Sequence, residues 1–213
     1  LVGSEMCIRD SIDAMVTTGY GRTAISDGDK SITEITCHAR GAHFLNPEVR
    51  TVIDIGGQDS KVIRLDEKGA VANFVMNDKC AAGTGRFLEM MARTMEMSLD
   101  DMGKAGLSYK EDITISSMCT VFAESEVVSL IAQNKATDDI VHGLNKAVAS
   151  KTAALAKRVG GEERYMMTGG VSKNQGLVKT LEEKIGTTLV ISDKAQLCGA
   201  LGAALFAKDM VTE

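Results

Sequence analysis

Apolar positions along the chain follow two different spacings, and the change between them separates a strand-rich segment from helical ones. Between residues 51 and 76, short apolar runs alternate with turns that contain Gly, Asp and Glu, the pattern of strands joined by tight turns. This pattern predicts three strands, over residues 51–55, 61–65 and 71–76. Because no helix interrupts them, we expect an antiparallel meander.

Elsewhere, apolar residues recur at steps of three and four, which is typical of helices that bury one face. The predicted helices span residues 32–45, 85–97, 122–133, 140–159, 176–185 and 197–208. Further strands are predicted over residues 14–17, 165–168 and 188–191. The combination predicts an α/β fold with a mixed sheet, since the uninterrupted meander argues against a purely parallel, doubly wound sheet.

Composition narrows the class of protein. With 213 residues and 44% hydrophobic content, the chain can bury a core as one domain or as two small lobes. Its net charge of −5 and its scattered basic residues argue against a nucleic-acid partner. No apolar run approaches the ~18 residues of a membrane span, so no membrane association is expected. Five cysteines, an odd number without paired short spacings, favour a reducing compartment and predict a cytoplasmic protein.

The first ten residues lack an initiating Met and show no period that joins them to the rest of the chain. We interpret residues 1–10, Cys7 included, as foreign or disordered sequence. The alternative is a natural, irregular N-terminus.

A double-glycine turn, Gly56-Gly57, joins the first two strands of the meander. A turn without β-carbons lets backbone amides approach a phosphate closely. A carboxylate at the strand end, Asp54, is suited to hold Mg²⁺ through water. The structural alternative is a plain hairpin in which the glycine pair only supplies positive φ angles.

A second pair, Gly169-Gly170, leads from a predicted strand into a helix. Exposed amides at a helix N-terminus suit an anionic or nucleotide ligand. The structural alternative is an ordinary helix entry with Ser172 as the capping residue.

Other motifs point to no further site. Residues 19–24 match the dinucleotide pattern G-x-G-x-x-A, but a polar loop comes after them, so we interpret them as a turn. The sequence has no G-x-x-x-x-G-K-[ST], which excludes a P-loop ATPase. The histidines His38, His43 and His142 lack ligand spacing and are predicted to be exposed or packed in the core rather than bound to a metal.

Two cysteines, Cys80 and Cys119, each precede a predicted helix. Amide groups and the positive end of a helix dipole favour a thiolate there. Two thiolates per chain are half of what a cubane iron-sulfur cluster needs, so a two-fold dimer would supply four ligands to one shared cluster. The alternative is a buried structural role, as we expect for Cys37 and Cys198 on apolar helix faces.

Taken together, these segments resemble the activator components of 2-hydroxyacyl-CoA dehydratases, which are related to the ATPase subunits of benzoyl-CoA reductase (the BadF/BadG/BcrA/BcrD ATPase family). The resemblance spans residues 13–208 and is carried by residues 18–22, 51–59, 76–89, 115–128 and 168–171. It implies the ATPase fold of actin, sugar kinases and heat-shock chaperones, here N-terminally truncated. Residues 11–47 would then be the remnant of a first lobe. Residues 48–208 would form the second, nucleotide-binding lobe, whose final helix packs back toward the first.

The resemblance also implies a homodimer in which Cys80 and Cys119 of both chains hold one [4Fe-4S] cluster. The residues that it assigns to ATP and Mg²⁺ are the catalytic Asp54 and Gln58, the phosphate-binding Gly56, Gly57 and Gln58, and Gly169 and Gly170 on the adenosine side. The implied activity is ATP-driven transfer of one electron from a ferredoxin or flavodoxin to an iron-sulfur dehydratase partner.

One feature of the family pattern, a D-x-G-S-T-x-x-K phosphate loop, is missing from this sequence. We therefore expect that the opening of the first lobe has been lost and that the chain as given hydrolyses ATP poorly. Two other functions stay open: a sugar or acyl kinase of the same superfamily with structural cysteines, and a truncated, non-catalytic interaction fragment.

Overall fold

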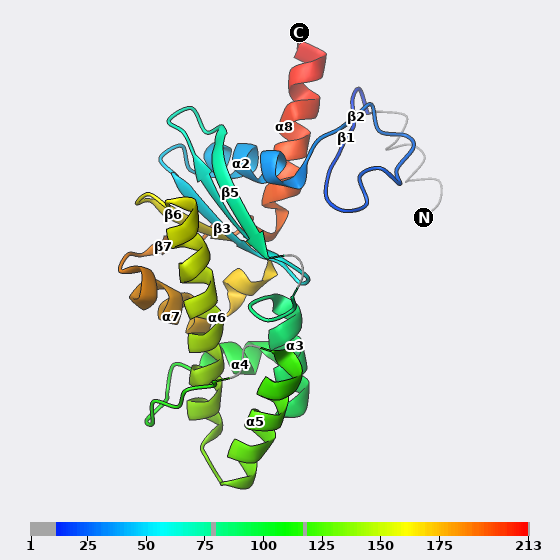
Figure 1. Cartoon of the computed structure of the whole chain (residues 1–213). Helices are drawn as coiled ribbons and strands as arrows, with labels where there is room; N and C mark the ends of the chain where they lie inside the picture. The colour runs from blue at the N-terminus through cyan, green and yellow to red at the C-terminus, as the bar shows by residue number, and fades with distance from the viewer. Residues whose placement is uncertain (1–11, 78–79, 117–118, 213) are drawn as a thin grey trace.

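A five-stranded mixed sheet separates two groups of helices in the computed structural model, which describes residues 12–77, 80–116 and 119–212 (Figure 1). Its strand order is β5-β4-β3-β6-β7. The strands are β3 (Thr51–Ile55), β4 (Ser60–Leu65), β5 (Val71–Asn77), β6 (Tyr165–Thr168) and β7 (Leu189–Val190). The first three pair antiparallel, whereas β6 runs parallel to β3 and β7 parallel to β6. The predicted meander and mixed sheet are confirmed.

Successive side chains of the central strands point to opposite faces of the sheet, and both faces are buried. Val52 and Met166 point into a cluster shared with α2 (Glu34–Leu45) and α8 (Cys198–Thr212). Ile53 and Met167 point into a larger cluster on the opposite face. There the sheet packs against α6 (Thr137–Val159), which in turn packs on α7 (Gln175–Ile185). A strand that is buried on both sides reads as a continuous apolar run, as residues 51–55 do.

Three shorter helices form an all-helical end of the molecule below the sheet (Figure 1). They are α3 (Gly85–Thr94), α4 (Leu99–Ala105) and α5 (Thr120–Ala132). The long helix α6 begins at this end and continues to the sheet (Figure 1). It therefore links the two parts of the molecule.

Helix α4 was not predicted, and the helix predicted over residues 85–97 is shorter than expected. Glu96 has a positive φ of 53°, which interrupts the helix after Thr94, the last residue of α3. Ser98 then caps α4 by accepting a hydrogen bond from the Asp101 amide at 3.1 Å. This capping pattern was a readable signal in the sequence.

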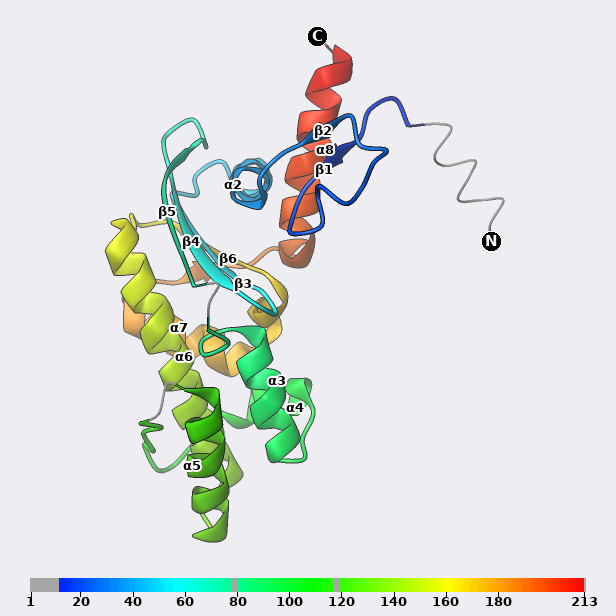
Figure 2. The same cartoon turned by 45° about the vertical axis from the view of Figure 1, so that its right-hand side comes forward.

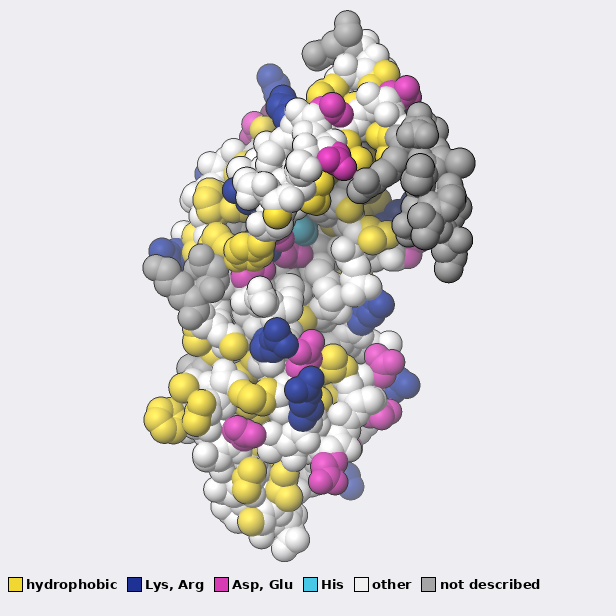
Figure 3. Space-filling view, turned by 90° about the vertical axis from the view of Figure 1, so that its right-hand side faces the viewer, with side chains coloured by type: hydrophobic (Ala, Val, Ile, Leu, Met, Phe, Trp, Pro, Cys, Tyr) yellow, Lys and Arg dark blue, Asp and Glu magenta, His cyan; other side chains and the backbone are white. Residues whose placement is uncertain are grey.

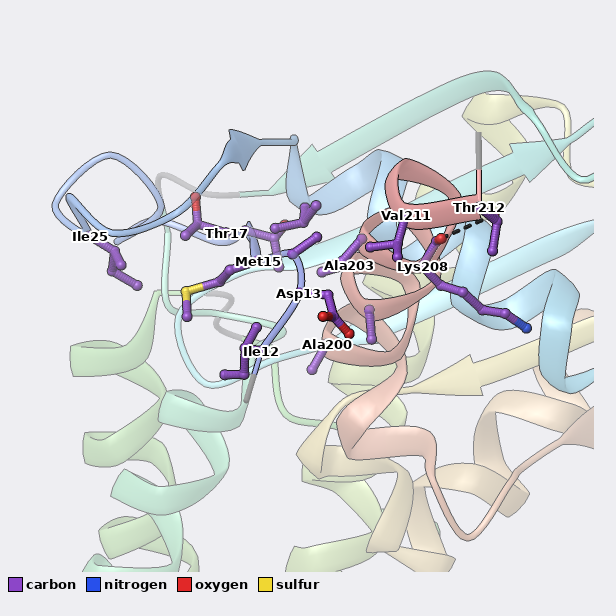
Figure 4. A pocket seen from close by; sticks show the side chains of 15 residues that line it. Ile12, Asp13, Met15, Thr17, Ile25, Ala200, Ala203, Lys208, Val211 and Thr212 are labelled. Atoms are coloured by element: carbon purple, nitrogen blue, oxygen red, sulfur yellow. Dashed lines mark hydrogen bonds between the residues drawn. The ribbon is translucent and has the colours of Figure 1, made fainter. Parts of the chain in front are cut away.

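A short parallel pair, β1 (Val16–Thr17) and β2 (Lys30–Ser31), lies beside α8, apart from the main sheet (Figure 2). Between residues 12–18 and α8 lies a largely apolar groove of 610 Å³, with Met15, Ala203 and Val211 in its lining (Figure 4). It contains none of the predicted site residues. The two-lobe division of the chain stays a prediction, and the interpretation of residues 1–10 concerns residues outside those that the structure describes.

Within residues 12–77, 80–116 and 119–212, no helix has the length and apolar content that crossing a bilayer requires. On the face drawn in Figure 3, acidic and basic side chains are interspersed.

Candidate functional site

The two double-glycine turns meet at one edge of the sheet. Gly56-Gly57 follows β3 and Gly169-Gly170 follows β6. Because β3 and β6 are parallel neighbours, both turns emerge at the same edge. The first turn of α3 rests on one of them: the Gly85 amide donates to the Gly56 carbonyl and the Arg86 amide to the Gly57 carbonyl, each at 2.8 Å.

Close approach, more than unusual backbone conformation, explains the glycines at this edge. Gly56 and Gly57 are not among the glycines with positive φ, so the alternative that this pair only supplies positive φ is wrong. A Cβ on Gly85 would lie 3.0 Å from the Gly56 carbonyl oxygen and 3.3 Å from the Val171 side chain. Gly169 does need a positive φ, of 84°, and a Cβ there would overlap the Ile55 carbonyl.

A cavity of 290 Å³ opens between these turns. The residues that line it include the glycines Gly56, Gly57, Gly85 and Gly170, the apolar Leu88, Leu99 and Val171, and the polar Glu89, Asp100, Lys173, Asn174 and Gln196. An apolar wall with a few polar groups is typical of a small-molecule site. Gly57 has open space where a Cβ would stand. Three of the residues assigned to ATP and Mg²⁺ do not line this cavity: Asp54, which is buried, Gln58, which is exposed on the turn, and Gly169.

Ser172 does not cap the following helix. Its hydroxyl donates to the Gly169 carbonyl at 2.7 Å and so closes the glycine turn. The N-cap of α7 is Asn174, whose side chain accepts from the Leu177 amide at 2.9 Å. A short 3₁₀ segment, Gly170–Lys173, therefore separates the glycine pair from α7.

Asp54 lies at the centre of a buried charge cluster that the sequence did not reveal. The cluster consists of Glu34, His38, Asp54, Asp59 and Lys61. Asp54 is 3% exposed and Lys61 1%. The Lys61 ammonium lies 3.0 Å from Asp54, 2.8 Å from Asp59 and 2.9 Å from Glu34. The other Asp54 oxygen accepts from the Thr168 hydroxyl at 2.8 Å.

His38 completes the cluster. Its Nδ1 lies 3.2 Å from the Glu34 carbonyl oxygen and its Nε2 3.2 Å from Asp54, so both nitrogens face acceptors. Burial alone would lower the pKa of His38, but the hydrogen bond to Asp54 and the Asp54 charge outweigh burial and raise it. Burial would raise the pKa of Asp54, yet His38 and Lys61 hold it well below its usual range. The prediction that His38 is packed in the core is confirmed, and its pKa is raised there.

Glu34, His38 and Asp54 also have the spacing of a metal site, since their ligand atoms lie within 4.8 Å of one another. Lys61 donates to the oxygens of two of them. This ammonium supplies the positive charge that the acidic groups need. Two of the three residues, Glu34 and Asp54, therefore bind a side-chain cation.

Cys80 is the exposed first residue of a turn, residues 80–84, that we call the Cys80 turn; Ala82, Gly83 and Thr84 of the same turn are buried. The Asn77 side chain donates to the Cys80 carbonyl at 3.0 Å and to the Ala82 carbonyl at 3.1 Å. The Thr84 hydroxyl donates to the Ala81 carbonyl at 2.6 Å. Thr84 is the N-cap of α3, so Cys80 stands four residues before the helix end at which it was predicted.

Cys119 is exposed and is itself the N-cap of α5, which begins at Thr120, two residues before the predicted start of this helix. Its carbonyl accepts from the Ala123 amide at 2.9 Å. In contrast, Cys37 and Cys198 are fully buried, which confirms their structural role, and burial raises the pKa of Cys198 to about 12. Cys80 and Cys119 thus have the accessibility that ligands of an external or shared group need.

The mixed sheet has helices on both faces, and one of its edges carries two glycine turns around a cavity. This arrangement is an actin-like ATPase fold. Residues 5–207 match the model of the BadF/BadG/BcrA/BcrD ATPase family. The chain belongs to this family, as its motifs predicted.

Relatives agree with this assignment. The chain is 51% identical over 199 residues to the activator of lactoyl-CoA dehydratase of Anaerotignum propionicum, covering 93% of this chain and 77% of the relative. Its structure matches the activator of the 2-hydroxyisocaproyl-CoA dehydratase from Clostridium difficile with bound ADPNP, with a TM-score of 0.94 and 48% identity over 100% of this chain and 79% of that one. Component A of the Acidaminococcus fermentans (R)-2-hydroxyglutaryl-CoA dehydratase gives a TM-score of 0.91 and 47% identity, over 94% and 77%.

Proposed function

We propose that this protein is an ATP-dependent activator that delivers one electron to a 2-hydroxyacyl-CoA dehydratase, or to a partner of the benzoyl-CoA reductase type. The electron passes through a [4Fe-4S] cluster shared by two copies of the chain, and a ferredoxin or flavodoxin supplies it. The observation that carries this proposal is the direct backbone connection between the Gly56-Gly57 turn and the helix that follows the Cys80 turn. The names of the relatives support the class of partner.

ATP is assigned to the cavity between the glycine turns. Gly56 and Gly57 offer a phosphate a wall without β-carbons, and of the two glycines assigned to the adenosine side, Gly170 lines the cavity and Gly169 directly precedes it in the chain. The bound ADPNP in the similar C. difficile structure supports a nucleotide here. Gln58 is exposed on the turn and is assigned to orient the hydrolytic water. Asp54, at the end of β3, is assigned to Mg²⁺ through water; its Oδ1 already accepts from Thr168 and its Oδ2 from Lys61, so water would have to reach a remaining lone pair.

Cys80 and Cys119 are the residues that would hold the cluster. Both are exposed, and their thiolates are the ligands that iron-sulfur clusters use. One chain supplies two of four ligands, so the site is complete only when a second copy contributes its own pair. When bound, the cluster supplies one-electron chemistry at low potential. The chain's own part is to hold both sulfurs at an accessible surface.

The glycine turn gives a route from nucleotide to sulfur. A ligand that displaces Gly56 and Gly57 also displaces the amides of Gly85 and Arg86, and with them α3 and the turn before it. A one-electron potential changes by 59 mV for about 1.4 kcal/mol. A few kcal/mol of nucleotide-linked strain would therefore change the reducing strength by roughly 100 mV or more.

Anaerobic purification followed by iron, sulfide and ATPase assays tests the proposal. Wild type and the control Cys198→Ala, which keeps both proposed ligands, should contain iron and sulfide. Cys80→Ser and Cys119→Ser should lose both. A colourless wild type that transfers phosphate to a small alcohol would indicate the kinase, and one that binds neither nucleotide nor iron would indicate the interaction fragment. The cytoplasmic location stays a prediction.

A further inference from the structure

A lysine of the long helix α6 reaches the Cys80 turn. The Lys151 ammonium donates to the Ala82 carbonyl at 2.6 Å. The aliphatic stem of the same side chain lies against Gly83: a Cβ built on Gly83 would stand 2.9 Å from Lys151 Cδ. The ammonium and the stem of Lys151 therefore make two separate contacts with the turn, at residues that lie 69 and 68 positions earlier in the sequence.

Lys151 differs from the other groups that hold this turn. Asn77 lies shortly before the turn in the chain and Thr84 is its last residue, whereas Lys151 belongs to a different element. Its neighbours Val148 and Ala149 are buried in the main core, so α6 is fixed at this point. Lys151 thus ties the buried part of the turn, next to the exposed Cys80, to α6.

The Lys151 contact also places a positive charge on the turn. A charge-assisted hydrogen bond to a carbonyl is stronger than a neutral one. A cation close to an iron-sulfur cluster stabilises the reduced form, which carries one more negative charge. The lysine is therefore suited both to fix the turn and to raise the reduction potential.

We propose that Lys151 is a positioning residue for Cys80. It holds the Cys80 turn in the conformation that presents the sulfur to the shared cluster, and its charge makes that cluster easier to reduce. This inference rests on the proposed function. Gly83 is the matching feature of the turn, because its φ of 85° and its missing side chain make room for the lysine stem.

Three substitutions separate the contacts. Lys151→Arg keeps the stem and the charged donor, Lys151→Met keeps only the stem, and Lys151→Ala removes both. The control is Lys157→Met, an exposed lysine two turns further along α6. All are purified anaerobically, and the measurements are the reduction potential and the rate at which a chelator removes iron.

We expect the arginine variant and the control to match wild type. The methionine variant should have a more negative potential and lose iron about tenfold faster, the factor that corresponds to 1.4 kcal/mol for one lost hydrogen bond. The alanine variant should lose iron faster still. A methionine variant that matches wild type in both measurements would overturn the inference, as would failure of arginine to restore them. Absence of iron from wild type and control would instead overturn the proposed function, and this inference with it.

Discussion

The buried charge cluster and the Cys80 turn lie on either side of the same glycine turn, yet they are held by opposite means. The cluster joins side chains of opposite charge inside the protein, with Lys61 and Asp54 almost inaccessible. The Cys80 turn presents only Cys80 at the surface and is held through its backbone carbonyls. Breaking a buried ion pair leaves an uncompensated charge without solvent, whereas breaking one of the turn's hydrogen bonds costs less free energy. We therefore expect nucleotide-driven displacement to reach α3 and the Cys80 turn and to leave the strand ends in place.

The largest effect should come from the cluster. Lys61→Met leaves Glu34, Asp54 and Asp59 without their shared cation and should lower the free energy of unfolding by about 3–5 kcal/mol. Urea unfolding measures it. The exposed Lys68→Met is the control and should change little. A decrease in the free energy of unfolding of less than about 1 kcal/mol for Lys61→Met would mean that the charge cluster does not stabilise the strand ends beside the glycine turn.

Two cysteine substitutions extend the contrast between the buried core and the surface turn. Cys198→Ser places a hydroxyl in a fully buried site and should cost about 1–3 kcal/mol, whereas Cys80→Ser in iron-free protein should stay within about 0.5 kcal/mol. Thermal and urea unfolding of iron-free samples compare them. Equal costs would contradict the assignment of Cys198 to the core and Cys80 to a surface site.

A smaller effect is expected at Gly83. Gly83→Ala meets the Lys151 stem and must adopt a φ of 85°, so it should cost about 1 kcal/mol. Combining it with Lys151→Ala removes the steric part and leaves the backbone part. A double-mutant cycle on unfolding free energies measures the coupling. Strict additivity would show that the two residues do not press on each other.

The smallest effect is a dependence of stability on pH. The raised pKa of His38 means that its contribution is fully present below about pH 6.5 and is lost as the pH rises through the folded-state pKa. Stability should thus fall above pH 6.5, by at most about 1.4 kcal/mol per unit for one proton. The lowered pKa of His142 acts in a different window, because it costs stability as the pH falls below 6.5. His38→Gln should flatten the profile above pH 6.5, and an unchanged profile would contradict a charged His38.

The sequence was sufficient for whatever depends on local pattern. Apolar runs predicted the strands of the meander, and double glycines marked both turns, because close backbone approach leaves that signature in composition. The buried charge cluster could not be predicted from the sequence, because Glu34 and His38 lie on α2 and only the packing of α2 on the sheet brings them near Asp54 and Lys61. Lys151 was missed for the same reason, since nothing local relates a helix lysine to a turn 69 residues earlier.

Native mass spectrometry of anaerobically purified protein tests the central claim most directly, because it reports copies of the chain and iron in one particle. The account predicts a dimer with one four-iron cluster for wild type, that is, about two irons per chain. Cys80→Ser and Cys119→Ser should each appear without the cluster. A wild-type monomer that carries its own cluster, or a dimer without iron, would contradict the shared site.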